Sequence, residues 1–315
     1  MRSAFAQEIT DLATSDDRMI VLSGDIGNQM FDDFQEKFPS RFINCGIAEA
    51  NMVSMAAGLA ICGMRPFIYT FTAFDTARCF EQIRVDLCYQ NLPVVIIGLG
   101  GGLTYAPLGP THYICEDIAI MRSLPNMTVL CPGDAVEVRC SLRESLNLKG
   151  PVYIRIGKKN EPVVHKDVVD FHIGKAITCK KGNDVCILTT GTILPNALKA
   201  HELLEKKKIS TQVVHFPTVK PLDLAALTTI FSHFNLVITL EEHSLIGGLG
   251  SAVAEWYVDT FKRTVKLVRL GTRDEFLYTS ISHNEARDYY GLSPEKISES
   301  VEKALILTKE QFHEN

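Results

Sequence analysis

The chain has 315 residues, of which 46% are hydrophobic and 22% charged, and its formal net charge is −5 at pH 7. These values exclude a disordered, collagen-like or disulfide-scaffold protein, and the short basic clusters give no sign of a nucleic-acid surface. At about 150 residues per domain, the length predicts two domains. The best apolar run, residues 92–99, is far shorter than the roughly 18 residues that a membrane span needs.

Two further features concern location and redox chemistry. The first eight residues include an acid and no long apolar stretch, so we expect no signal peptide and a cytoplasmic protein. The nine cysteines are scattered and form no C-x-x-C pair, which argues against a zinc site and against a disulfide framework. We interpret most of them as small core residues.

Apolar runs alternate with amphipathic helical patterns along the first half of the chain. Continuous β-branched runs between amphipathic helices are typical of a parallel sheet that helices cover on both faces. The first half is therefore predicted to be a doubly wound α/β domain. Helices are expected at 4–12, 48–61, 72–89, 115–123 and 135–146, and strands at 19–22, 66–70, 94–99, 127–131 and 152–156.

A charged, proline-containing stretch, residues 157–169, interrupts the alternation, which then resumes. We predict a first domain over 1–160, a linker over 161–178, and a second, smaller α/β domain over 179–315. In the second half, strands are expected at 185–189, 211–216, 236–240 and 265–270, and helices at 194–205, 222–231, 250–261 and 294–307.

The glycine-rich segment 247–250 lies between a predicted strand and a predicted helix, as a dinucleotide-binding loop would. The third glycine of that fingerprint is missing, and Glu241 and Glu242 just before it would place negative charge near a phosphate. We interpret the segment as a loop that starts a helix in an open α/β sheet.

Three segments of the first half carry candidate functional side chains. Glu49 opens a helix of Ala, Met, Gly and Val; burial disfavours its charge and the helix N-terminus favours it, although such a residue needs no function. Phe71 and Phe74 follow a strand and suit either an aromatic wall or core packing. Thr111 and His112 lie on a Gly/Pro-rich loop after a strand, where functional residues concentrate.

In this order, the segments resemble the transketolase family, specifically the section that carries its pyrimidine-binding and C-terminal domains. The resemblance covers nearly the whole chain, and the ordered set is specific although F-x-x-F alone is not. The opening segment with Arg2 and the segment with Asp25 also resemble the start of that section. The matching motifs are G-I-x-E at 46–49, F-x-x-F at Phe71 and Phe74, G-P-T-H at 109–112 and P-N-M at 125–127.

The resemblance implies thiamine diphosphate as cofactor. Glu49 would donate a hydrogen bond to, or share a proton with, the N1′ atom of the aminopyrimidine, which requires a buried and partly protonated carboxyl group. Phe71 and Phe74 would stack on the pyrimidine, and Asp25 and Ile47 are further expected cofactor contacts. The cofactor would act as carbanion and electron sink.

The resemblance also implies a substrate side of the site. His112 would face the substrate and polarise its oxygens. Arg2 and Arg155 match places where the family holds a sugar phosphate, a task that suits the planar fork of a guanidinium group.

Four positions depart from the family pattern. Leu108 and Gly100 replace a substrate-facing Asp and His, Ala77 replaces an aromatic residue of the pyrimidine wall, and Gln29 stands where a phosphate-contacting Ser is common. These departures leave the physiological donor and acceptor sugars open.

The family's G-D-G motif and the asparagine that follows it, which bind the diphosphate and the metal, have no counterpart in this chain. The resemblance therefore implies a partner, an N-terminal subunit that supplies the diphosphate site and Mg²⁺ (or Ca²⁺), and no metal site in this chain itself. A dimer of heterodimers is the expected assembly. We expect no nucleic-acid and no membrane partner.

The leading hypothesis is the B-type subunit of a split transketolase, which transfers a two-carbon ketol unit from a ketose to an aldose. One alternative is the β subunit of a 2-oxo acid dehydrogenase, which usually has a paired-His loop where this chain has only His112. A relative of deoxyxylulose-phosphate synthase is another. A non-catalytic partner subunit is the third: Glu49 and His112 argue against it, while Leu108 and Gly100 keep it open.

Overall fold

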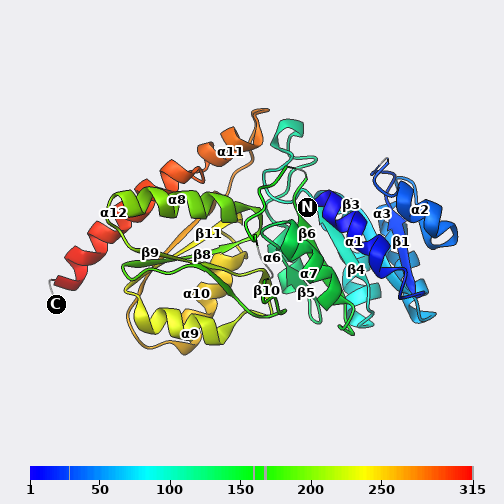
Figure 1. The fold of residues 1–315 in the computed structure, drawn as a ribbon, viewed down its shortest axis with the longest axis horizontal. Coiled ribbons are helices and arrows are strands. Elements are labelled where there is room, and N and C mark those ends of the chain that lie inside the picture. The colour runs from blue at the N-terminus through cyan, green and yellow to red at the C-terminus, as the bar shows by residue number, and fades with distance from the viewer. Residues whose placement is uncertain (28, 159, 167–168, 314–315) are drawn as a thin grey trace.

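The computed structural model describes residues 1–27, 29–158, 160–166 and 169–313. Two α/β units lie side by side, with the N-terminus in the first and the C-terminal helix at the far end of the second (Figure 1). The expected class of two α/β domains is confirmed. No helix in these ranges is long and apolar enough to cross a membrane.

The first unit is built on a mostly parallel sheet with the strand order β10-β5-β6-β4-β3-β1-β2. Side chains alternate between its two faces: Val21 and Phe67 join one core cluster, Leu22 and Ile68 the other. Both faces are therefore covered. The strands are β1 Met19–Ser23, β2 Phe42–Asn44, β3 Arg65–Phe71, β4 Val95–Leu99, β5 Thr128–Leu130 and β6 Val152–Ile156; the helices are α1 Arg2–Leu12, α2 Asp32–Lys37, α3 Glu49–Ile61, α6 Asp117–Ser123 and α7 Ala135–Ser145.

The seventh strand of this sheet comes from the second half of the chain. β10 (Thr218–Lys220) pairs antiparallel with β5, and the Lys220 ammonium group donates to the carbonyl oxygens of Arg122 and Leu124. One core cluster also runs through both units. The two units are thus joined by a shared sheet and a shared core, while the boundaries at 160 and 178 remain predictions.

The second unit has a five-stranded sheet in the order β12-β11-β8-β9-β7, antiparallel only at the β7 edge. Helices α8 and α12 lie on one side of it and α9 and α10 on the other (Figure 1). Its strands are β7 Ile177–Lys180, β8 Val185–Thr190, β9 Thr211–His215, β11 Leu236–Ser244 and β12 Lys266–Thr272; its helices are α8 Leu194–Lys206, α9 Leu224–His233, α10 Leu249–Thr260, α11 His283–Tyr289 and α12 Pro294–His313.

The single helix expected over 72–89 is wrong. The structure has a one-turn helix α4 (Thr72–Asp75), a short α5 (Phe80–Gln82) and a wider π-helical stretch η2 (Ile83–Tyr89). The Thr76 hydroxyl donates back to the carbonyl oxygen of Thr72, a local bond that competes with a regular helix. The chain therefore turns over residues 76–79, directly after α4.

The glycine-rich segment starts helix α10, as expected. The buried Glu241 carboxylate accepts from the backbone N–H groups of Leu249 and Gly250, so it fills the place that a phosphate would take. A Cβ at Gly248 would lie 2.1 Å from Glu241 Oε2, which explains the glycine there. Burial raises the pKa of Glu241 to about 7, although both N–H groups act in the opposite direction.

All nine cysteines are free. Five of them are buried, at positions 79, 88, 115, 131 and 186, which agrees with their expected role in the core.

Candidate cofactor and substrate site

The candidate site lies where β1, β3 and β4 end. These strands are neighbours and parallel, so their carboxyl ends meet at one edge of the sheet, the usual ligand-binding edge of an open α/β fold. Phe71 is the last residue of β3, and Gly100 directly follows β4. Glu49 opens α3 at the same edge, where a Cβ at Gly24, just beyond β1, would lie 3.5 Å from its Cγ.

Glu49 is a buried acid with one cationic partner. Its side chain is 3% exposed, and Arg78 Nη1 donates to its Oε2 at 2.9 Å. The Arg78 guanidinium also lies over the Phe74 ring, 4.1 Å from the centroid. Sequence reasoning missed Arg78, although its place four residues after Phe74 is a usable signal.

Aromatic rings form the wall of the site. Phe71 and Phe74 meet edge to face at 5.5 Å between centroids, and the His112 ring lies 5.5 and 5.4 Å from them. Tyr105 packs on Phe71 at 4.8 Å. The structure therefore brings Phe71, Phe74 and His112 together although up to 41 positions separate them, and the Arg78 contact ties Glu49 to the same group.

A cavity of about 510 Å³ borders this wall at Phe74, although Phe71 and His112 are not among its lining residues. Phe74, Arg78 and Thr111 line it from the first unit, and the half-exposed Phe276 lines it from the second. The Thr111 hydroxyl is 2.8 Å from His112 Nδ1, which orients the imidazole. Ala77 also lines the cavity. Its small side chain leaves open the space that the family's aromatic residue would fill.

Arg2, Gln29 and Asp33 all line a second, polar cavity of about 420 Å³ between α1 and the loop after β1. Gln29 also lines an adjacent cavity together with Asp25 and Asn44. Asp25 is exposed and accepts from Asn44 Nδ2 at 2.9 Å. Arg2 and Gln29 thus line one cavity, which a common role would require, and Asp33 adds a negative charge to the same lining.

Ile47 is 81% exposed. The loop before it is fixed by Asn44, whose side-chain oxygen accepts from the N–H of Gly46 at 2.9 Å. An apolar side chain held outward on an ordered loop suits contact with another molecule.

The expectation for Arg155 needs correction. Its side chain is 5% exposed, its Nε lies 2.9 Å from Asp117 Oδ2, and its Nη2 donates to the carbonyl oxygen of Glu242 in the second unit. The Nη2 contact joins the two units, and burial together with the ion pair to Asp117 argues against a phosphate-binding role for this guanidinium. Lys158, three residues later, is less buried, and its Nζ lies 4.7 Å from the centroid of the Tyr105 ring.

Two departures from the family pattern have structural explanations. Gly100 has φ +71°, and a Cβ there would lie 2.1 Å from Tyr105 Cε2, so the Tyr105 ring fills the space that a side chain would need. Leu108 is 54% exposed at the end of the short helix η3 (Ala106–Leu108), so it offers an apolar surface beside the cavity loop.

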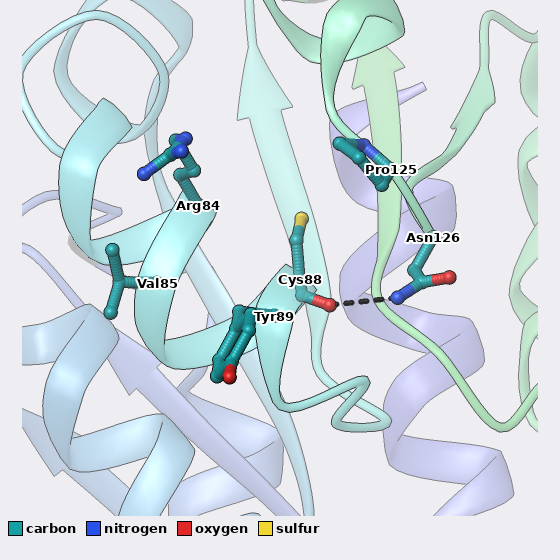
Figure 2. A pocket seen from close by; sticks show the side chains of 6 residues that line it. All are labelled: Arg84, Val85, Cys88, Tyr89, Pro125 and Asn126. Carbon is teal, nitrogen blue, oxygen red and sulfur yellow. Dashed lines mark hydrogen bonds between the residues drawn. The ribbon is translucent and has the colours of Figure 1, made fainter.

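A separate apolar cavity of about 410 Å³ lies between η2 and the P-N-M segment (Figure 2). Asn126 donates from Nδ2 to the carbonyl oxygen of Cys88 at 3.0 Å, so this motif anchors η2 to the loop before β5. Arg84 is the only charged side chain among the described residues of its lining, which includes no carboxylate and no histidine. Within the described ranges, no group of His, Cys, Asp and Glu side chains is arranged to hold a metal ion.

The two α/β units define a class of protein with a doubly wound first unit and a smaller second unit built on a five-stranded sheet. Family models agree, because the transketolase pyrimidine-binding domain matches residues 1–163 and the transketolase C-terminal domain matches residues 174–297. The chain belongs to the transketolase family.

Two relatives and one solved structure match this chain over more than 90% of the length of both proteins. One of the subunits of the apulose-4-phosphate transketolase of Phocaeicola vulgatus is 35% identical, over 94% of each chain. The 6-deoxy-6-sulfo-D-fructose transketolase subunit SqwH of Clostridium sp. strain MSTE9 is 36% identical, over 94% of this chain and 92% of its own. A solved structure described as a split gene transketolase, inactive beta4 tetramer, superimposes with a TM-score of 0.88 at 35% identity, over 98% of both chains.

Proposed function

We propose that this chain is the C-terminal subunit of a split, thiamine-diphosphate-dependent transketolase that transfers a two-carbon ketol unit from a ketose to an aldose. The observation that carries the proposal is the placement of a buried acid, Glu49, beside the wall of Phe71, Phe74 and His112. The two relatives that match over more than 90% of their own length are named as transketolase subunits, which supports the same reaction class.

The described residues suit an aminopyrimidine ring. Glu49 would hold a proton at N1′, because a carboxyl group shielded from water can share a proton with a ring nitrogen. Phe71 and Phe74 would pack against the ring and exclude water. His112, on the loop at the cavity edge, would donate a hydrogen bond to a substrate oxygen. The bound cofactor would supply the carbanion and electron sink that this reaction needs.

A sugar with an anionic group is the proposed substrate class. Arg2 and Gln29 share the polar cavity, and Lys158 holds its ammonium group over Tyr105, which in turn packs on Phe71. The two relatives are named for a sugar phosphate and a sulfo sugar, both of which carry an anionic group.

The diphosphate and Mg²⁺ would be held by an N-terminal partner subunit, so the chain would be active only in a complex. The exposed Ile47 beside Glu49 supports a contact at this edge. The similar solved chain is described as an inactive tetramer of one subunit type, which fits a chain that needs a partner. A dimer of heterodimers remains the assembly we propose.

The test is a calorimetric titration of thiamine diphosphate and Mg²⁺ into the chain alone and into its complex with the N-terminal subunit, with ketol transfer from a ketose phosphate followed in the same samples. Binding and turnover only in the complex are expected. Glu49→Gln should abolish most turnover while the complex still forms, and Glu299→Gln on the exposed face of α12 should change neither. Full turnover by the Glu49→Gln complex would refute the proposal.

A further inference from the structure

Residues 103–113 form a closed loop that carries part of the candidate site. The neck of the loop is the pair Gly102 and Ile114: the N–H of Gly102 donates to the carbonyl oxygen of Ile114 at 2.8 Å, and the N–H of Ile114 donates back at 3.3 Å. The position of the loop decides where three side chains of the site lie. These are Tyr105, Leu108 and His112.

Two hydrogen bonds reach this loop from residues 273–282 of the second unit, between β12 and α11. The Ser280 hydroxyl donates to the carbonyl oxygen of Pro107 at 2.7 Å, in the middle of the loop. The N–H of Leu277 donates to the Tyr113 hydroxyl at 2.7 Å, at the end of the loop, and this bond is buried.

A third bond holds the start of the loop and ends on Glu242 of β11, whose side chain is buried. The N–H of Leu103 donates to Glu242 Oε1 at 2.8 Å, and a Cβ at Gly102 would lie 2.6 Å from the same oxygen. His283 and Arg287 of α11 contact the same carboxylate. Burial opposes the charge of Glu242, but Arg287 and His283 prevail and hold its pKa well below its ordinary value. One carboxylate thus joins the loop to α11.

Among the described residues, these three are the hydrogen bonds that leave the loop and its neck. The Thr104 hydroxyl donates to the carbonyl oxygen of Gly101, which adjoins the neck, and the other hydrogen bonds of residues 103–113 are internal to the loop. The first unit holds the loop by packing, as in the contact of Tyr105 with Phe71. The polar anchors of the loop therefore all belong to the second unit.

We infer that the second unit positions the His112 loop through a three-point clamp, formed by Glu242, Leu277 and Ser280, and that Ser280 is a positioning residue for turnover. The inference rests on the proposed function, in which His112 faces the substrate. A displacement of about 1 Å can cost a reaction up to about a hundredfold in rate. Bonds that fix the loop therefore affect turnover although they lie outside the contacts proposed for the substrate.

The clamp can be tested by hydrogen exchange in the isolated chain, without any cofactor. The N–H groups of Leu108, Gly109 and His112 donate to carbonyl oxygens within the loop, so they exchange when the loop opens. Ser280→Ala removes one anchor, and one hydrogen bond changes such an opening equilibrium about fivefold. These three amides should therefore exchange about fivefold faster, while the amides of β8 should not change.

Two further variants serve as controls. Ser280→Thr keeps the hydroxyl group and should exchange like the wild type. Ser232→Ala on α9 removes a similar bond, from the Ser232 hydroxyl to the carbonyl oxygen of Thr228 at 2.7 Å, and should leave the loop amides unchanged.

A second anchor is tested by Tyr113→Phe. This variant keeps the ring but leaves the N–H of Leu277 without its partner, so the loop amides should exchange about tenfold faster. Unchanged exchange in either Ser280→Ala or Tyr113→Phe would overturn the three-point clamp.

The consequence for turnover is tested in the complex with the N-terminal subunit. Ser280→Ala should lower kcat for ketol transfer about fivefold, because His112 is no longer held in place. The affinity for thiamine diphosphate should stay within about twofold of the wild type, since Glu49, Phe71 and Phe74 lie outside the loop. Ser280→Thr should restore kcat, and Ser232→Ala should not change it.

The measured quantity is kcat per bound cofactor, which a general loss of stability would not move. An unchanged value in Ser280→Ala would overturn the positioning role. No turnover by the wild-type complex would refute the proposed function, whereas hydrogen exchange in the isolated chain would still decide whether the second unit holds the loop.

Discussion

Arg78 links Glu49 to the aromatic wall: its Nη1 donates to Glu49 Oε2 at 2.9 Å while its guanidinium plane lies 4.1 Å from the Phe74 centroid. A guanidinium can stack on a ring and donate hydrogen bonds in its own plane, which an ammonium group cannot do. The contact joins the start of α3 to the turn after β3, two elements that are 29 residues apart in sequence.

The first prediction follows from this contact. Arg78→Ala should lower the free energy of unfolding by about 2 to 3 kcal/mol, because the Glu49 side chain, 3% exposed, would remain buried without its cation and one stacking contact is lost. Arg78→Lys should recover only part of that loss, since it restores the charge but not the planar contact. Urea denaturation of the isolated chain measures both. Arg84→Ala, an exposed arginine on η2, is the control and should lie within about 0.5 kcal/mol of the wild type.

The second prediction separates Lys158 from Arg155. Lys158→Met should raise KM for a phosphorylated donor about tenfold, the loss of one charge-assisted contact, with little change in kcat. Arg155→Met should instead destabilise the chain by about 3 kcal/mol, because Asp117 would remain buried without its cation. Steady-state kinetics of the complex and urea unfolding of the chain distinguish the two. A KM effect at position 155 without a loss of stability would restore a phosphate-binding role for that arginine.

Position 155 also shows what sequence patterns can and cannot predict. The strand run 152–156 was predicted with its correct bounds, since a continuous apolar run marks a strand that is covered on both faces. The pattern does not tell which charged residue near the strand end emerges toward solvent. Asp117 and Glu242, the partners that keep Arg155 buried, are 38 and 87 residues away, and no local signal indicates them.

The residues of the candidate site were easier to find than its supporting contacts. Glu49, Phe71, Phe74 and His112 stand in motifs with fixed spacing, so their order along the chain identified them. Arg78 is only four residues after Phe74 in the sequence, yet its contact with Glu49 depends on how the turn after β3 meets the start of α3. Such contacts appear only when the tertiary structure is known.

The junction between the units contains one carboxylate held by two histidines. Glu137 of α7 accepts at 2.6 Å from His165 of the connecting segment and at 3.0 Å from His215 of β9. Burial alone would raise the pKa of Glu137, but His215 and His165 together lower it to about 2. Burial likewise opposes the charge of His165, but the bond to Glu137 prevails and raises the pKa of His165.

The third prediction concerns the pH dependence of this junction. A histidine with a raised folded pKa stabilises the protein below its ordinary value of 6.5, and this stabilisation is lost as the pH rises through the folded pKa. The stabilisation that ionised Glu137 provides is present above pH 4.5 and is lost as the pH falls toward 2. The cluster is therefore strongest between about pH 4.5 and 6.5.

His165→Gln should remove the loss of stability that the wild type shows as the pH rises above about 6.5. The wild type should exceed the variant by about 1 kcal/mol near pH 6, and the difference should shrink as the pH rises. Thermal or urea unfolding across pH 5 to 9 measures it. His172→Gln, exposed on the same connecting segment, should follow the wild-type curve. A constant difference across the range would show that His165 acts only as a neutral hydrogen-bond donor.

The fourth prediction uses two glycines with similar φ angles. Gly100 and Gly109 have φ +71° and +77°, but a Cβ at Gly100 would meet the Tyr105 ring, whereas a Cβ at Gly109 would meet nothing within 4 Å. Gly109→Ala should therefore cost only backbone strain, about 2 kcal/mol, because its ψ of −176° lies in a region that glycine alone adopts readily. Gly100→Ala should cost about 3 kcal/mol, because overpacking against a buried ring adds to the strain of its own positive φ.

Urea unfolding of the two variants measures both costs. If the Tyr105 ring causes the added loss, Gly100→Ala should cost less in a Tyr105→Ala background than in the wild type, because the clash disappears with the ring. An equal cost of Gly100→Ala in both backgrounds would mean that the loop after β4 can shift, and that the place of Gly100 is open to a side chain.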